Sequence, residues 1–270
     1  GLKHKKWGFV GLGTFGSPYK MPGIKLDPFY DTSLQAAGAG GMSTSVGTVN
    51  GGTNSNVLTH DGFVSSALFY KSPSWNNAWL SFVISPDEKN GGALNGNADD
   101  GDDNDFSVSV VYKNGPIYAA TAYASNSVDG GTNEDAWKIA MQMSMAGHTL
   151  GFQYEWIDNS SSTNTGNGNV NRVSNFSSIE DNAGGSTDGE VWFLSYGYKM
   201  GNNKFIAQFG ETNSDEGGQE SEYMALGMYH YFSKKTRLFA GYSESDTGTN
   251  AVINSTGDRE VWTIGLRKDF

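Results

Sequence analysis

The stretch that decides the fold is residues 137–156, WKIAMQMSMAGHTLGFQYEW. Apolar and polar side chains alternate from Trp137 to Ser144 and again from Thr149 to Trp156. A period of two places the apolar side chains on one face of a β-strand and the polar ones on the other. Residues 146–148 separate the two halves and have the length and the glycine of a tight hairpin. The stretch therefore predicts two antiparallel strands, each with one apolar and one polar face.

The same pattern recurs along the chain, for example over 106–112 and from Glu260 to the last residue, Phe270. The connections between the predicted strands are alternately short and long. The short ones are 113–115, 146–148, 201–203 and 233–235, and the long polar ones are 88–104, 125–135, 158–189, 213–221 and 245–258. Short turns at one end of the strands and long polar loops at the other are typical of a transmembrane β-barrel of the bacterial outer membrane.

Composition limits the remaining classes. Only 37% of the 270 residues are hydrophobic, and no run of 18 apolar residues occurs, so no transmembrane helix is predicted. A barrel strand needs only about 10 alternating residues and leaves a weak hydropathy signal. The absence of Cys excludes disulfides, thiol catalysis and Cys-ligated zinc. A net charge of -11 argues against nucleic acid as a partner, because phosphates are neutralised by Lys and Arg.

Aromatic residues gather near the predicted strand ends, where a membrane-facing girdle would place them. The aromatic residues assigned to this girdle are Tyr112, Tyr118, Trp137, Trp156, Tyr196, Tyr198, Tyr229 and Tyr231. A soluble, secreted β-sheet protein that binds carbohydrate or calcium also shows alternation and stays open at this point. The acidic run 99–105 suits divalent cations, which could bridge it to lipopolysaccharide phosphates, or it is simply a solvated loop.

Several short motifs carry a resemblance to a known family. They are Ser-Pro-Tyr-Lys at 17–20, Leu-Asp-Pro-Phe-Tyr-Asp-Thr at 26–32, Tyr-Lys-Ser-Pro-Ser at 70–74, Phe-Ser-Lys-Lys-Thr at 232–236, Ala-Gly-Tyr at 240–242 and Gly-Leu-Arg-Lys-Asp-Phe at 265–270. With a final aromatic residue on an alternating strand, the chain resembles the Gram-negative general porins over nearly its whole length. The resemblance implies an all-β, antiparallel transmembrane barrel in the outer membrane of a Gram-negative bacterium.

The resemblance also implies sixteen strands, a homotrimer and a long third loop that folds into the lumen. The sequence shows about thirteen strands, beginning with a remnant at 1–3, so we expect a single barrel domain over 1–270 that lacks its first three strands and most of the fourth. Residues 17–58, between strands predicted at 7–13 and 62–71, match the inward loop. The two prolines of 17–22 and the absence of a helical period predict no helix there.

In such a barrel, charged groups at the narrowest point set selectivity. The resemblance selects Asp27 and Asp31 as loop carboxylates, with Lys20 and Lys25 in the same loop able to compensate them. Thr14 stands where many members of the family carry a wall arginine, and Phe63 stands at a second such position. Because these two positions of the wall lack arginine and the net charge is negative, we expect the channel to prefer cations weakly.

The polar strand faces are expected to line the lumen. The side chains chosen for this role are Lys138, Gln142, Gln153, Glu155, Gln208 and Arg267. In a soluble sheet the same residues would form the wet face, and the barrel assignment decides between the two.

No catalytic residue, metal site or cofactor is predicted, because the four His residues show no ligand spacing and none stands beside a nucleophile motif. The sequence therefore predicts a non-enzymatic channel for passive diffusion of ions and small hydrophilic solutes, in contact with outer-membrane lipid and lipopolysaccharide. A substrate-specific channel, or another outer-membrane barrel such as an enzyme acting on lipid, is the alternative.

Overall fold

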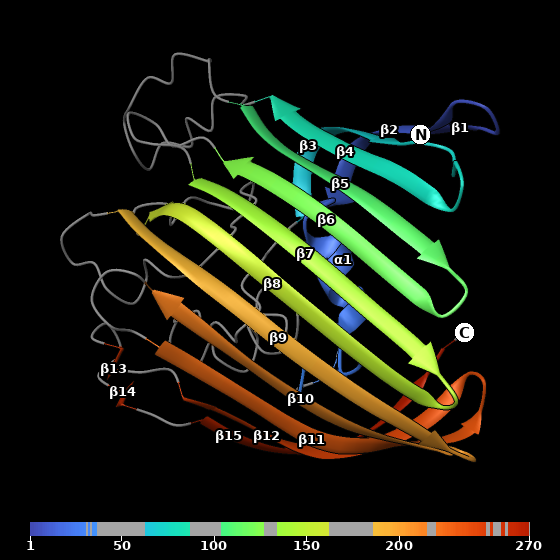
Figure 1. The fold of residues 1–270 in the computed structure, drawn as a ribbon, viewed down its shortest axis with the longest axis vertical. Helices are drawn as coiled ribbons and strands as arrows, with labels where there is room; N and C mark the ends of the chain where they lie inside the picture. The colour runs from blue at the N-terminus through green and yellow to red at the C-terminus, as the bar shows by residue number, and fades with distance from the viewer. Residues whose placement is uncertain are drawn as a thin grey trace.

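The computed structural model describes residues 1–30, 32, 34–36, 63–86, 104–126, 134–161, 186–214, 220–246, 249–250, 255–256 and 259–269. Its main element is one curved antiparallel sheet of thirteen strands (Figure 1). The strands are β1 (Leu2–His4), β2 (Gly8–Gly16), β3 (Phe63–Lys71), β4 (Ala78–Pro86), β5 (Asn104–Asn114), β6 (Ile117–Asn126), β7 (Glu134–Met145), β8 (His148–Ser161), β9 (Ser186–Met200), β10 (Asn203–Ser214), β11 (Glu220–Ser233), β12 (Thr236–Asp246) and β15 (Arg259–Lys268). A small separate pair is formed by β13 (Thr249–Asn250) and β14 (Ser255–Thr256).

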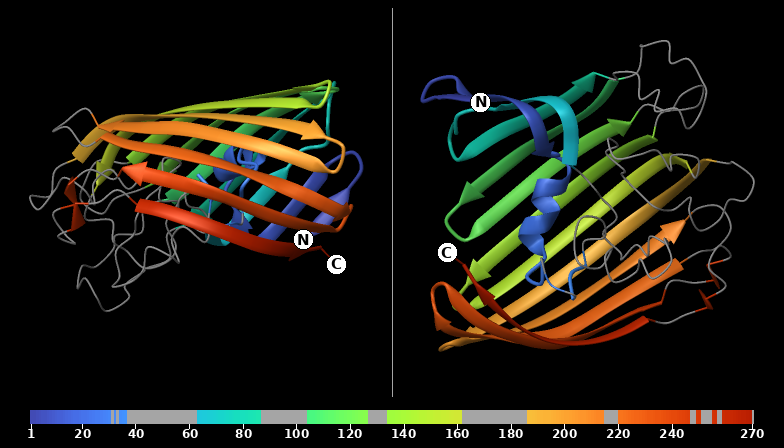
Figure 2. Two further views of the ribbon diagram at one scale, coloured as in Figure 1. Left: turned by 90° about the horizontal axis from the view of Figure 1, so that it is seen from below. Right: turned by 180° about the vertical axis from the view of Figure 1, so that it is seen from behind.

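The strands pair in sequence order, so the sheet is a continuous meander from β1 to β15. Tight connections join β5 to β6, β7 to β8, β9 to β10 and β11 to β12, as the sequence predicted. The predicted long connection 158–189 is shorter at both ends, because β8 continues to Ser161 and β9 begins at Ser186. The sheet curls into most of a barrel wall, and within the described residues its two edges, β1 and β15, are not paired (Figure 2).

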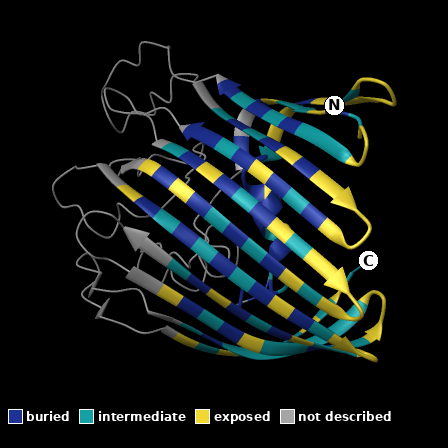
Figure 3. Cartoon of the chain, viewed as in Figure 1, coloured by how far each residue is buried: buried dark blue, intermediate teal, exposed yellow. Residues whose placement is uncertain are grey.

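Burial alternates from one residue to the next along most of the long strands, as expected when successive side chains point to opposite faces of the sheet (Figure 3). On the convex face the register sets apolar side chains opposite one another from β7 to β11, as the row Met141, Phe152, Leu194, Phe209 and Met224. Met141 and Phe209 of this row are exposed. On β11, Met224, Leu226 and Met228 take this face, which leaves the tyrosines of that strand to the concave face.

The girdle prediction was therefore wrong for Tyr118, Tyr229 and Tyr231. Tyr118 and Tyr229 are buried on the concave face. Tyr231 has the same parity as Tyr229, and its ring packs beside that of Tyr229. An aromatic residue near a strand end can belong to a membrane girdle or to an interior contact. Only its odd or even position along the strand shows which face of the sheet its side chain is on. Tyr112, Trp137, Trp156 and Tyr196 do lie exposed on the convex face.

Helix α1 (Lys20–Leu26) lies against the concave face, where Figure 2 shows it crossing the inside of the curved sheet. The expectation of no helix in this region was wrong. Pro22 is the third helical residue, and its missing N–H falls in the first turn, where an N–H has no intrahelical partner. No helix of the described part of the chain is long and apolar enough to cross a membrane.

Small residues on the sheet make room for the described residues between 17 and 36 (17–30, 32 and 34–36), which we call the inward segment. The wall nearest α1 is built from buried alanines of β6 and β7: Ala120, Ala122, Ala124, Ala136 and Ala140. Farther along, a Cβ added at Gly227 would lie 2.9 Å from the Phe29 ring, and one at Gly241 would lie 2.6 Å from a methyl group of Leu34. Larger wall residues would push the inward segment off the sheet.

Candidate functional site

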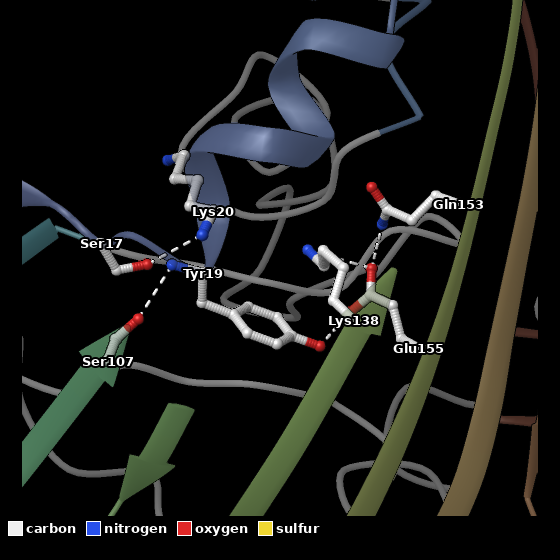
Figure 4. Close-up of polar contacts among 7 residues, drawn as sticks. All are labelled: Ser17, Tyr19, Lys20, Ser107, Lys138, Gln153 and Glu155. Atoms are coloured by element: carbon white, nitrogen blue, oxygen red, sulfur yellow. Dashed lines mark hydrogen bonds and ion pairs between the residues drawn. The ribbon is translucent and has the colours of Figure 1, made fainter. Parts of the chain in front are cut away.

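The inward segment is fixed to the wall at one end by Tyr19, whose hydroxyl donates a hydrogen bond of 2.6 Å to Glu155 Oε2 (Figure 4). Glu155 on β8 faces Lys138 on β7 in register, and their charged groups are 3.2 Å apart. Gln153 Nε2 donates a further hydrogen bond to the same carboxylate. The Lys138 ammonium also lies 4.0 Å from the centre of the Tyr19 ring, a cation–π contact. Lys138, Gln153 and Glu155 have no exposed surface.

The backbone at this end is held as well. The Tyr19 N–H donates to the Ser107 hydroxyl at 2.8 Å, so Tyr19 is hydrogen-bonded to both β5 and β8. Figure 4 shows Lys20 directed away from the Glu155 carboxylate, with its backbone N–H donating to the Ser17 hydroxyl. Lys20 is buried, at 1% exposure.

The middle of the inward segment is anchored through Asp27. Oδ1 accepts hydrogen bonds from the Phe29 N–H at 2.9 Å and from Gln208 Nε2 at 2.6 Å, and Oδ2 accepts from the Ala36 N–H at 2.8 Å. Asp27 therefore closes the turn 27–36 on itself and ties it to β10. At 4% exposure this carboxylate serves the fold of the segment rather than an open water path.

Hydroxyl groups of the wall satisfy carbonyls of the inward segment. Ser195 on β9 donates to the Leu26 carbonyl at 2.7 Å, and Tyr229 on β11 donates to the Pro28 carbonyl at 3.1 Å. The Tyr223 hydroxyl contacts the Leu34 carbonyl and lies 3.0 Å from Gln208 Oε1. Gln142 on β7 donates to the Lys25 carbonyl at 3.2 Å. The segment is thus hydrogen-bonded to β5 and to each strand from β7 to β11.

The structure brings most of the sequence-selected residues to this concave face. Lys20, Lys25 and Asp27 lie in the inward segment, and the wall residues Lys138, Gln142, Gln153, Glu155 and Gln208 contact it. Arg267 on β15 pairs in register with Arg237 on β12 and lies 3.1 Å from Asp269. Thr14 is exposed at a register shift of β2, between Gly13 and Phe15. Asp31 and the acidic run 99–105 lie outside the residues whose side chains are described.

Sequence reasoning missed several concave-face residues: the anchors Tyr19, Tyr223, Tyr229 and Ser195, and the cations Lys71, Lys113, Lys199, Lys204 and Arg237. The odd or even position of each residue within its strand would have assigned the basic residues to the concave face. Lys113, for example, has the same parity as Ser107 and Ser109, and Lys204 has the same parity as Gln208.

Comparison with known proteins shows which family the chain belongs to. Residues 1–250 match the family model described as Gram-negative porin. The chain belongs to the Gram-negative porin family. It is therefore an outer-membrane β-barrel protein and a passive diffusion channel rather than an enzyme. No sequence among the curated proteins matches this porin.

Solved structures show the same fold. An anion-selective porin from Comamonas acidovorans is 17% identical with a TM-score of 0.65, and the match covers 98% of this chain and 75% of that chain. OmpF of Salmonella typhi is 10% identical with a TM-score of 0.62, covering 96% of this chain and 74% of that one. The trimer form of OmpT of Vibrio cholerae is 12% identical with a TM-score of 0.56, covering 96% and 76%. At these identities the likeness concerns the fold.

The porin assignment makes the convex row of apolar side chains a lipid-facing surface, which gives a stability prediction. Leu194 lies mid-strand on β9, opposite Phe152 and Phe209. Leu194→Arg should destabilise the folded protein in a bilayer by about 2–4 kcal/mol, because a cation would lie in hydrocarbon. Unfolding by denaturant in lipid vesicles measures this. Glu190→Arg, on the same face but nearer the strand end, should cost about 1 kcal/mol or less; equal costs at both sites would contradict a lipid-facing convex surface.

Proposed function

We propose that this porin is a general diffusion channel whose bore is narrowed by the segment 17–58 and which passes anions in preference to cations. The described part of that segment supports the first half of the proposal. Residues 17–36 lie on the concave face, are hydrogen-bonded to β5, β7, β8, β9, β10 and β11, and contain the buried anchors Tyr19 and Asp27. A segment held at this many points would stay inside the channel during solute passage.

Charge on the concave face supports the second half, and it is the observation that carries the proposal. The described basic residues on this face or in the inward segment include Lys20, Lys25, Lys71, Lys113, Lys138, Lys199, Lys204, Arg237 and Arg267. The described acidic ones are Asp27, Glu155 and Asp269. Glu155 is paired with Lys138, Asp27 accepts hydrogen bonds, and Asp269 lies beside Arg237 and Arg267. The described basic side chains on this face therefore outnumber the acidic ones, and its net charge is positive.

This distribution reverses the preference that net charge suggested. A net charge of -11 describes the whole chain, but selectivity depends on the charges that line the bore, where walls of low dielectric constant focus the field. Acidic side chains such as Glu190, Glu211, Glu222 and Glu244 have the parity of the convex face. The solved relative from Comamonas acidovorans is itself an anion-selective porin, which agrees with the proposal.

Zero-current potentials test this function. The reconstituted porin in a KCl gradient across a planar bilayer should give a reversal potential displaced toward that of chloride. Arg237→Gln/Arg267→Gln should move the potential toward that of potassium, whereas Glu211→Gln/Glu222→Gln on the convex side should leave it in place. A wild-type potential displaced toward that of potassium would contradict the proposed anion preference.

We further propose that the porin is a homotrimer of single barrel domains, in agreement with the trimer form of the OmpT relative. Single-channel openings that close in three equal steps would support this assembly. Single independent steps from fully folded protein would contradict it.

A further inference from the structure

A cavity of about 510 Å³ lies between α1 and the wall formed by β2 to β6, and neither Tyr19 nor Asp27, the buried anchors of the inward segment, lines it. Its size falls within the roughly 300–1,000 Å³ that is usual for pockets that hold small organic ligands. Lys71, Lys113 and Trp79 place it at the short-turn end of these strands, because each lies within two residues of a turn or at a strand terminus. The cavity therefore lies toward the short-turn end of the strands, beside α1.

Aromatic rings form much of the cavity wall. Phe15 and Phe69 stack with ring centres 4.9 Å apart and an angle of 21° between their planes. Trp79 and Tyr118 also line the cavity, with Pro18 and Pro22 contributed by the inward segment. A lining of this kind favours a flat, apolar body over a fully hydrated ion or a sugar.

Three cations border the same cavity: Lys25 from α1, Lys71 from β3 and Lys113 from β5. No acidic residue lines it, and within the described part of the chain these lysines form no ion pair. Lys71 lies 5.0 Å from the centre of the Trp79 ring, which sets a positive charge directly beside an aromatic face. Among the described residues, no acidic side chain at the cavity neutralises these lysines.

We infer that this cavity is a binding subsite for amphipathic organic anions, most simply aromatic carboxylates, on the short-turn side of the inward segment. The rings would enter between the aromatic side chains, and the carboxylate would lie among Lys25, Lys71 and Lys113. A diffusion pore that prefers anions needs positive charge but no aromatic cavity. The subsite would slow such anions in transit and so give the channel a preference among solutes. The inference rests on the proposed channel function.

Current blockade by 2-naphthoate tests the subsite. The porin in a planar bilayer should show brief interruptions of the KCl current whose frequency rises with 2-naphthoate concentration. 2-Naphthalenemethanol carries the same rings without the charge, and acetate carries the charge without the rings. Each should need at least about ten times the concentration of 2-naphthoate for equal blockade, because the alcohol lacks the carboxylate for the lysines and acetate lacks the rings for the aromatic side chains.

Matched variants locate the blockade. Lys71→Gln/Lys113→Gln should raise the half-blocking concentration of 2-naphthoate roughly tenfold, as expected for two partly solvated charge contacts. Lys6→Gln/Lys234→Gln removes the same charge from exposed short turns at the same end of the sheet and should change it less than twofold. If the first double variant forms no channels, Lys25→Gln on the helix tests the same site with the same direction of change.

Two results would overturn the subsite: wild-type channels no more sensitive to 2-naphthoate than to acetate, or equal shifts in both double variants. The reversal potential of the same channels in a KCl gradient separates this inference from the proposed function. A chloride preference without naphthoate blockade removes the subsite alone. A potassium preference with blockade that depends on Lys71 and Lys113 removes the proposed anion preference and keeps the subsite.

Discussion

Glu155→Leu is expected to destabilise the folded porin by about 3–5 kcal/mol, the cost of leaving one charge of a buried pair without its partner. The Lys138 ammonium would lose the carboxylate 3.2 Å away, and Tyr19 would lose its hydrogen bond to Glu155 Oε2. Lys138 and Glu155 are fully buried, so water cannot replace what is lost. Denaturant unfolding of the protein in detergent or lipid gives the change in free energy.

A double variant distinguishes the cost of an unpaired charge from the cost of altered packing. Lys138→Met/Glu155→Leu removes both charges and keeps similar volumes, so most of the lost stability should return. Glu211→Gln is the matched control on the convex face, where the carboxylate accepts one hydrogen bond of 3.0 Å from Trp192 and is only partly buried. It should cost about 1 kcal/mol or less. A Glu155→Leu variant as stable as the Glu211→Gln variant would contradict the anchoring role of the pair.

The same change should alter the channel. Tyr19 joins the inward segment to β8 through Glu155 and to β5 through Ser107. Glu155→Leu should therefore show noisier and more variable openings than the wild type. Lys138→Met/Glu155→Leu should do the same, because it also lacks the carboxylate that accepts the hydrogen bond from Tyr19.

The sheet could be predicted because period-two alternation is a local property. The strands flanking residues 146–148 follow directly from the run 137–156, and the thirteen-stranded sheet confirms the strand count that the alternation indicated. Register then follows from tight hairpins such as Ala146–Gly147, which leave no freedom to slip.

The concave-face contacts could be predicted only in part. Lys138, Glu155 and Gln208 were selected because they lie on the polar faces of alternating strands. Tyr223 and Tyr229 were not selected, because an aromatic residue suits lipid and interior equally and its partner, a carbonyl of the inward segment, is about 190 to 200 residues away in sequence. No local pattern encodes such a contact.

The role of Asp27 illustrates a further limit. Its selection as a pore carboxylate came from a motif of the family and stays a prediction, whereas its hydrogen bonds from the Phe29 and Ala36 N–H groups and from Gln208 were not predicted. Hydrogen bonds of a carboxylate to its own turn depend on a fold that sequence spacing does not fix. The inner-face cations were missed for a related reason, since net charge averages over both faces of the sheet.

A bulky negative charge placed at position 25 should strongly reduce the channel current, because Lys25 is exposed on α1 and borders the aromatic cavity. The natural chain has no Cys, so Lys25→Cys creates a unique thiol. Reaction with a sulfonatoethyl methanethiosulfonate would replace a cation in the proposed bore by a bulkier anion. Both the size and the sign of this change oppose the flow of chloride.

Met143→Cys is the matched control across the wall. Gln142 donates to the Lys25 carbonyl from the concave face, and the next residue, Met143, is exposed on the convex face. The two engineered thiols therefore lie at a similar level of the barrel, one inside and one outside. Mass spectrometry of each labelled protein establishes that the reaction has occurred.

The measurement that tests the account most directly is the single-channel current of Lys25→Cys before and after labelling. We predict a stepwise fall in current and a displacement of the reversal potential toward that of potassium, with neither change in Met143→Cys. A fully labelled Lys25→Cys porin whose current and reversal potential are unchanged would show that α1 lies away from the permeation path, and the proposal of an inward segment that narrows the channel would be wrong.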